Sequence, residues 1–187
     1  MTLVESLLLA LALCVDSFVV STTSAFKRKM SYGLGLQVAF VLALFQGLFP
    51  LLGALLGGAF KEVASAVDHW IAFGLLLFVG GKMIWDAFHD AKDDATLDVT
   101  RFGTMCLLGV ATSIDAFVVG IGFGLSSTRW ETLVTVLVIL VVTFVVSVVG
   151  VFLGKRNIPV PEKTATVLAG IVLIALGTYT LLQHTLL

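Results

Sequence analysis

Long runs of apolar residues alternate with short polar connections along the whole chain. Each run is about as long as the roughly 20 apolar residues that cross a bilayer as one helix. Within the runs, polar and apolar positions do not alternate as they do in the strands of a membrane β-barrel. The pattern therefore predicts an all-α integral membrane protein with six transmembrane helices, at about residues 3–25, 33–58, 69–89, 102–125, 130–153 and 165–183.

Composition supports this class. The 187 residues are 59% hydrophobic and only 12% charged, about half the charged fraction of a soluble domain. So few charges cannot cover a water-exposed surface, which argues against a soluble enzyme. The net charge of −1 argues against a nucleic-acid partner. The two cysteines, Cys14 and Cys106, form no Cys-x-x-Cys motif, so we expect neither a disulfide framework nor a structural zinc site. No cofactor is expected.

The basic residues indicate how the chain crosses the membrane. Connections one, three and five share one side, and they hold eight Lys and Arg residues against two on the other side. Because cytoplasmic loops carry the excess of Lys and Arg, we expect both termini to be external. The acidic loop 90–101 is then cytoplasmic. The eight residues are Lys27, Arg28, Lys29, Lys92, Arg101, Lys155, Arg156 and Lys163; the two are Lys61 and Arg129.

The two halves of the chain repeat each other. Residues 12–20 align with residues 111–119 at an offset of 99, with the Ala, Asp, Phe, Val and Val positions identical. The third and sixth runs align near offset 96. The second and fifth align near offset 97, pairing Gly53 with Gly150, Gly57 with Gly154 and Gln46 with Thr143.

Three spans per repeat make the second repeat enter the membrane from the opposite side, an inverted-topology duplication common in secondary transporters. We therefore expect one transmembrane domain over 1–187, with repeat one at 1–89 and repeat two at 102–187.

Small residues recur along the first and fourth spans at steps of three and four. Such residues let helix backbones approach closely in lipid, so we expect these two stripes to pack against each other. The first stripe is Ala10, Cys14, Ser17, Ser21 and Ala25; the second is Gly109, Ser113, Ala116, Gly120 and Gly124.

Asp16 and Asp115 occupy matching positions near the middle of the first and fourth spans. An Asp at that depth costs roughly 2.5–3.5 kcal/mol on insertion scales, which indicates a function. Two carboxylates offset the charge of one divalent cation, and without it their repulsion favours protonation. We predict a metal-ion site that exchanges with protons. The structural alternative is two protonated carboxyls that hold helices together.

Other polar groups are candidates for the pathway. Oxygen ligands suit Mg, Ca and Mn, whereas Zn and Cu favour imidazole and thiolate. Lys82 and Asp86 are spaced to pair on one helix face, either as a structural ion pair or as part of a gate. The oxygen candidates near the aspartates are Ser17, Gln46, Thr112 and Ser113.

At these positions the sequence resembles the bacterial manganese efflux pump family (MntP-type). The resemblance implies six helices, export of Mn²⁺ from the cytoplasm across the inner membrane, and transport roles for Asp16 and Asp115. Some family members have Glu where Gln46 and Asp86 stand. The motifs that carry the resemblance are Asp16-Ser17-Phe18, Ala111-Thr112-Ser113-Ile114-Asp115-Ala116, Phe45-Gln46, Pro50-Leu51-Leu52-Gly53, His69-Trp70-Ile71-Ala72-Phe73 and Gly80-Gly81-Lys82-Met83-Ile84.

Without the resemblance, the residues indicate only a cation-linked transporter with an inverted repeat. The partners are then a divalent metal ion, protons and the lipid bilayer. One alternative is a proton-coupled exporter of another cation or small solute, as in the related lysine-exporter superfamily. A channel is another. An intramembrane protease would need its two carboxylates about 3 Å apart.

Overall fold

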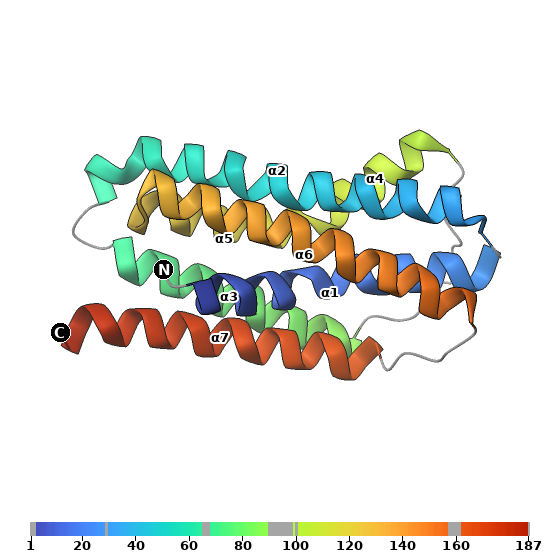
Figure 1. Ribbon diagram of the computed structural model, residues 1–187. Coiled ribbons are helices and arrows are strands. Elements are labelled where there is room, and N and C mark those ends of the chain that lie inside the picture. The colour runs from blue at the N-terminus through green and yellow to red at the C-terminus, as the bar shows by residue number, and fades with distance from the viewer. Residues whose placement is uncertain are drawn as a thin grey trace.

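The computed structural model describes residues 3–28, 30–64, 68–89, 99, 101–156 and 162–186. These residues form helices that run mostly along one axis, with both chain termini at the same end (Figure 1). The helices are α1 (Leu3–Arg28), α2 (Tyr32–Ala64), α3 (Asp68–His89), α4 (Phe102–Thr112), α5 (Ile114–Ser126), α6 (Arg129–Lys155) and α7 (Glu162–Leu186).

Each of the six predicted spans falls on helix, but the fourth is broken. It divides into α4 and α5, which meet at Ser113 with a bend of 47°. By length and apolar composition, α1, α2 and α6 can each cross a bilayer, and the bent pair makes a fourth span if it is counted as one. The described apolar stretches of α3 and α7 are shorter, at Phe73–Lys82 and Thr166–Tyr179.

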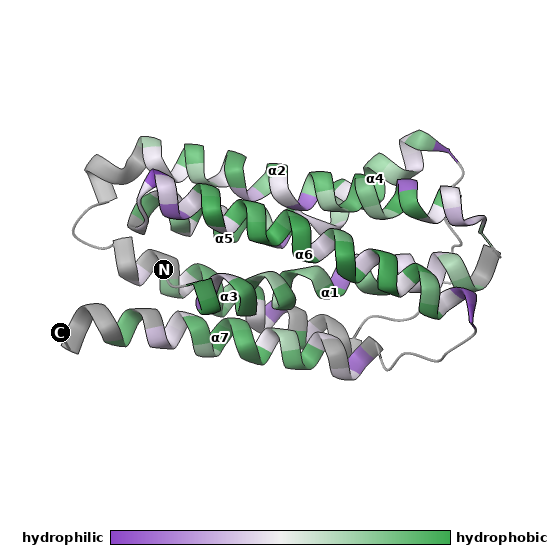
Figure 2. Ribbon diagram, in the orientation of Figure 1, coloured by the Kyte–Doolittle hydropathy of each residue, from purple (hydrophilic) through white to green (hydrophobic). Residues whose placement is uncertain are grey.

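The outer surface of the bundle is apolar, and several polar side chains are buried inside it among apolar ones. On α6, Leu137 and Val141 are 61% and 54% exposed, whereas Thr143 and Ser147 are completely buried. Over the described residues, the hydropathy colouring shows mostly apolar residues along the helices and hydrophilic residues mainly near the helix ends (Figure 2). A soluble protein rarely exposes so many large apolar side chains together, so lipid is the surrounding that this surface suits.

Glycines set the closest contacts between α2 and α5. A Cβ atom at Gly53 would overlap the carbonyl oxygen of Phe117, and one at Gly57 would overlap that of Ile121. Only glycine leaves room for backbones at this separation. The two helices therefore pack backbone against backbone.

The contact between α1 and α6 follows the same plan. A Cβ atom at Gly150 would crowd the carbonyl oxygen of Phe18, and one at Gly154 would overlap that of Thr22. These four residues are the partners of the α2–α5 set at offsets 97 and 99. The third close pair is α3 with α7, where the Gly80 and Gly170 backbones face each other.

The expectation that the two small-residue stripes pack against each other is wrong. The α1 helix packs mainly on α6, whereas Gly120 and Gly124 of the second stripe pack against Pro50 and Ala54 of α2. A small residue shows that a neighbouring backbone comes close, but it does not show which neighbour. Each stripe therefore serves a different helix pair.

Candidate functional site

The structure brings the two predicted aspartates together in space. Asp16 lies midway along α1 and Asp115 lies at the second residue of α5, and both are half-buried. Their carboxyl groups are within electrostatic range of each other. The site therefore holds two carboxyl groups close enough to influence each other.

The break at Ser113 places Asp115 in the first turn of a new helix. Its Oδ1 accepts a hydrogen bond of 2.8 Å from the backbone N–H of Ala116. The positive end of the helix dipole favours a negative charge at this position. The other oxygen, Oδ2, is buried and has no hydrogen-bond partner among the described residues. One oxygen is thus held by the helix, and the second remains open to a ligand.

Gln46 joins the two halves of the site. Its Nε2 donates to the carbonyl oxygen of Leu13, one turn before Asp16, at 2.9 Å. Its Oε1 accepts from the hydroxyl of Ser113 at the break, also at 2.9 Å. The side chain is completely buried. Gln46 therefore acts first as a cross-link that positions the two aspartate-bearing segments.

The other oxygen candidates differ in what they contact. The Thr112 hydroxyl donates to the carbonyl oxygen of Leu108 at 2.9 Å and lies 3.3 Å from that of Gly109. The Ser17 hydroxyl is completely buried, and the described part of the chain offers it no hydrogen-bond partner. Of the two, Ser17 has the less committed oxygen.

Lys82 of α3 lies within electrostatic range of Asp115. The residue itself is exposed, on the outer face of the bundle. Its predicted partner Asp86 has a side chain outside the described residues, as has almost all of the acidic loop 90–101. The Lys82–Asp86 pair and the cytoplasmic location of the loop stay predictions.

The donor set suits a hard cation. Among the residues that the structure describes, no three His, Cys, Asp or Glu side chains gather as a metal site. A cation at the aspartates would therefore be held by two carboxylates and by neutral oxygens. Such a set matches Mg, Ca or Mn rather than Zn or Cu.

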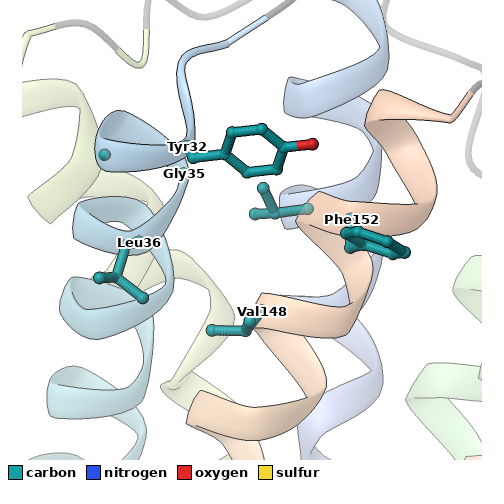
Figure 3. Close-up of a pocket in the computed structure, with 7 residues that line it drawn as sticks. Tyr32, Gly35, Leu36, Val148 and Phe152 are labelled. Atoms are coloured by element: carbon teal, nitrogen blue, oxygen red, sulfur yellow. The ribbon is translucent and has the colours of Figure 1, made fainter.

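A groove of about 290 Å³ lies elsewhere, between the start of α2 and the end of α6. Tyr32, Leu36, Val148 and Phe152 line it (Figure 3). Lys155 of α6 contacts the neighbouring connection between α1 and α2. Its Nζ donates a hydrogen bond to the Met30 carbonyl oxygen at 2.7 Å and lies 3.4 Å from the centroid of the Tyr32 ring. The groove's side chains offer no set of metal ligands, so the aspartates remain the candidate site.

The sequence pattern did not predict three buried hydroxyl groups as candidates for the site. Ser21, Thr143 and Ser147 are completely buried and, like Ser17, find no hydrogen-bond partner among the described residues. Two signals pointed to them: Thr143 and Ser147 are four residues apart on one helix face, and Thr143 is the repeat partner of Gln46.

Known proteins place the chain in a family. The profile of a family described as "Putative manganese efflux pump" matches residues 29–181. The chain belongs to the MntP manganese efflux pump family. Relatives that carry the same description are 39% identical in Parabacteroides distasonis, over 98% of both chains, and 37% identical in Gloeothece citriformis, over 98% of this chain and 97% of the relative. No solved structure matches.

Membership confirms the resemblance found in the sequence. The MntP family is one of transport proteins, so the prediction that this chain is not an enzyme is confirmed. Together with the apolar helices, membership makes the chain a multi-pass membrane protein. Membership in the family does not identify the residues that bind the ion or the coupling to protons.

Proposed function

We propose that this protein is a secondary transporter that exports Mn²⁺ from the bacterial cytoplasm across the inner membrane in exchange for protons. Asp16 and Asp115 are the ligands of the ion. The observation that carries the proposal is that these two carboxyl groups lie within electrostatic range of each other inside an apolar bundle, in a chain whose relatives are described as manganese efflux pumps.

Charge balance explains why ion and proton exchange at one site. Two carboxylates neutralise one divalent cation, so the loaded site carries no net charge. When the ion leaves, the carboxylates repel each other and take up protons. Both states are thereby spared the cost of uncompensated charge in a low-dielectric interior. Protons and Mn²⁺ then compete for the same oxygens.

We further propose that the six spans form an inverted repeat. The close contacts support it, because the Gly53–Phe117 contact recurs as Gly150–Phe18 at the offsets that align the repeats. Exchanging the repeats turns the α1–α6 pair into the α5–α2 pair and returns α3–α7 to itself. In transporters with a two-fold relation of this kind the substrate site lies at the repeat interface, which supports an ion site at Asp16 and Asp115.

The orientation follows from the distribution of charge. Both termini lie at one end of the bundle, together with the helix ends that flank the α2–α3 and α5–α6 connections, and the helix ends that flank the three basic connections lie at the other end (Figure 1). Because basic connections face the cytoplasm, the termini are external.

A transport assay tests the proposal. Inside-out membrane vesicles with this protein should take up Mn²⁺ when the vesicle interior is acidic, and dissipating the proton gradient should stop the uptake. In cells without their own exporter, the protein should restore growth in manganese. Uptake that is unaffected by the proton gradient would contradict exchange. Proton-driven transport of another solute with no response to manganese would favour the lysine-exporter alternative.

A further inference from the structure

Hydroxyl groups in membrane helices usually donate to the carbonyl four residues earlier, and several in this protein do so. Thr22 donates to Phe18 at 2.7 Å, and Thr132 donates to Thr128 at 3.0 Å. Thr178 follows the same rule on α7. Local bonding is therefore available to a buried hydroxyl in this bundle.

Four hydroxyls do not bond in this way. They belong to Ser17 and Ser21 of α1 and to Thr143 and Ser147 of α6, and we call them the hydroxyl cluster. Each residue is completely buried, and none of the four oxygens has a hydrogen-bond partner within the described residues. A buried polar group without a partner costs about 1–3 kcal/mol, so four together require an explanation.

The four hydroxyls lie in one stretch of the α1–α6 interface. Upstream, Ser6 hydrogen-bonds Thr135 across the same interface at 2.9 Å; downstream, Gly150 meets Phe18. Residues of α1 are therefore level with residues about 130 positions later in α6, which puts Ser17 level with Ser147. At this register Thr143 is level with Leu13 and Ser21 is level with Val151, so the cluster reaches about one helical turn to either side of Asp16.

The equivalent interface in the other half of the protein carries no such open hydroxyls. At offsets 99 and 97, the partners of the cluster are Ala116, Gly120, Gln46 and Pro50. Ala, Gly and Pro have no side-chain polar atom, and both groups of the Gln46 amide are hydrogen-bonded. Of the two interfaces, the uncommitted hydroxyls are thus confined to the one between α1 and α6.

We propose that the hydroxyl cluster is a second binding position, which holds a partly hydrated divalent cation in the α1–α6 interface beside the aspartates. The inference rests on the proposed function, since it takes the transported ion as the ligand. Neutral hydroxyls accept from and donate to the water ligands that a hard cation keeps. Without a carboxylate in the cluster, the ion is held weakly and passes on to Asp16 and Asp115.

Two variants that remove a hydroxyl with little change in volume test the cluster. In proteoliposomes at low manganese concentration, Thr143→Val and Ser147→Ala should each lower the initial transport rate about tenfold. Neither should lower thermal stability, because each removes an unpaired polar group. Wild-type rates in both variants would overturn the inference, as would a loss of stability as large as that of the control.

Thr135→Val is the matched control. It makes the same change on the same helix, but at a hydroxyl that is paired with Ser6. It should lower thermal stability and change the rate per folded protein less than about twofold.

Chemical accessibility separates this inference from the proposed function. In a variant without the two native cysteines, Ser21→Cys should react with a small cationic thiol reagent from the cytoplasmic side, and manganese should slow the reaction. If wild-type protein moves no manganese while Cys at this position still reacts, the proposed function fails and the polar route stands. If manganese is transported while no reaction occurs, the cluster is not on the route.

Discussion

Replacing Gln46 by Met tests whether this side chain holds the two halves of the site together. Met keeps the length and approximate volume of Gln but has neither the amide donor nor a strong acceptor. The substitution removes the bond to the Leu13 carbonyl and the bond from the Ser113 hydroxyl, both 2.9 Å long and buried. Ser113 is then left without its acceptor at the break between α4 and α5.

The expected loss follows from the two bonds. Hydrogen bonds between membrane helices contribute about 0.6 kcal/mol each on average, so the two together give about 1.2 kcal/mol. A buried hydroxyl that loses its acceptor costs up to about 3 kcal/mol. Gln46→Met should therefore lower the free energy of unfolding by about 1–3 kcal/mol. It should also lower manganese transport, because Asp115 follows directly after the loosened break.

Reversible unfolding of the purified protein in mixed micelles measures the change. The control is Gln37→Met, the same substitution at an exposed position of α2, which should change stability by less than about 0.5 kcal/mol. Gln46→Glu should keep both bonds at acidic pH, where the carboxyl can still donate, and lose one as pH rises. Equal stability of Gln46→Met and the control would refute the cross-link.

Further predictions address packing, protons and topology. Gly53→Ala should sharply lower the folded yield, because its Cβ atom would overlap a carbonyl oxygen. Gly74→Ala should leave the yield unchanged, because a Cβ atom there meets nothing within 4 Å. Equal yields of the two variants would contradict the close contact at Gly53. Manganese binding should weaken as pH falls, because protons occupy the same carboxylates; a titration from pH 8 to 5 that shows constant affinity would exclude exchange. With the native cysteines replaced, a probe at Glu62 should react in intact cells and one at Arg28 should not, and the opposite result would reverse the orientation.

The apolar pattern located the helices well, because the length of a span is set by the bilayer. The second predicted run, 33–58, for instance, lies wholly inside α2. The repeat also identified Asp16 and Asp115, which the fold brings within electrostatic range. Periodicity and spacing suffice for such features, because each depends on a single helix or on a direct comparison of two segments.

Hydropathy alone could not predict the helix break at Ser113. The run from Phe102 to Leu125 is mostly apolar, but Ser113 followed by Asp115 is typical of a helix start. The corresponding residue in α1 is Cys14, and there the helix continues. Serine and aspartate in the middle of an apolar run were thus the available signal for a helix terminus as well as for a ligand.

The sequence pattern could not predict which helix each helix packs against. A stripe of small residues indicates that another helix comes close, but the spatial arrangement of the helices decides which one it is. The hydroxyl of Ser17 shows the same limit, because a serine in a stripe is either packing or an open oxygen. The structure distinguishes these two cases, because it shows which buried hydroxyls have hydrogen-bond partners, as Ser6 has in Thr135.

The most direct test of the shared site is manganese binding to purified protein, measured by calorimetry for wild type, Asp16→Asn, Asp115→Asn and the double variant. Asn keeps the shape of Asp and removes its charge. Each single variant should fold at normal yield and lose binding almost completely, and the double variant should be no worse, because groups that act as one unit are not additive. Binding by the double variant at wild-type affinity would contradict the site and place it elsewhere in the protein.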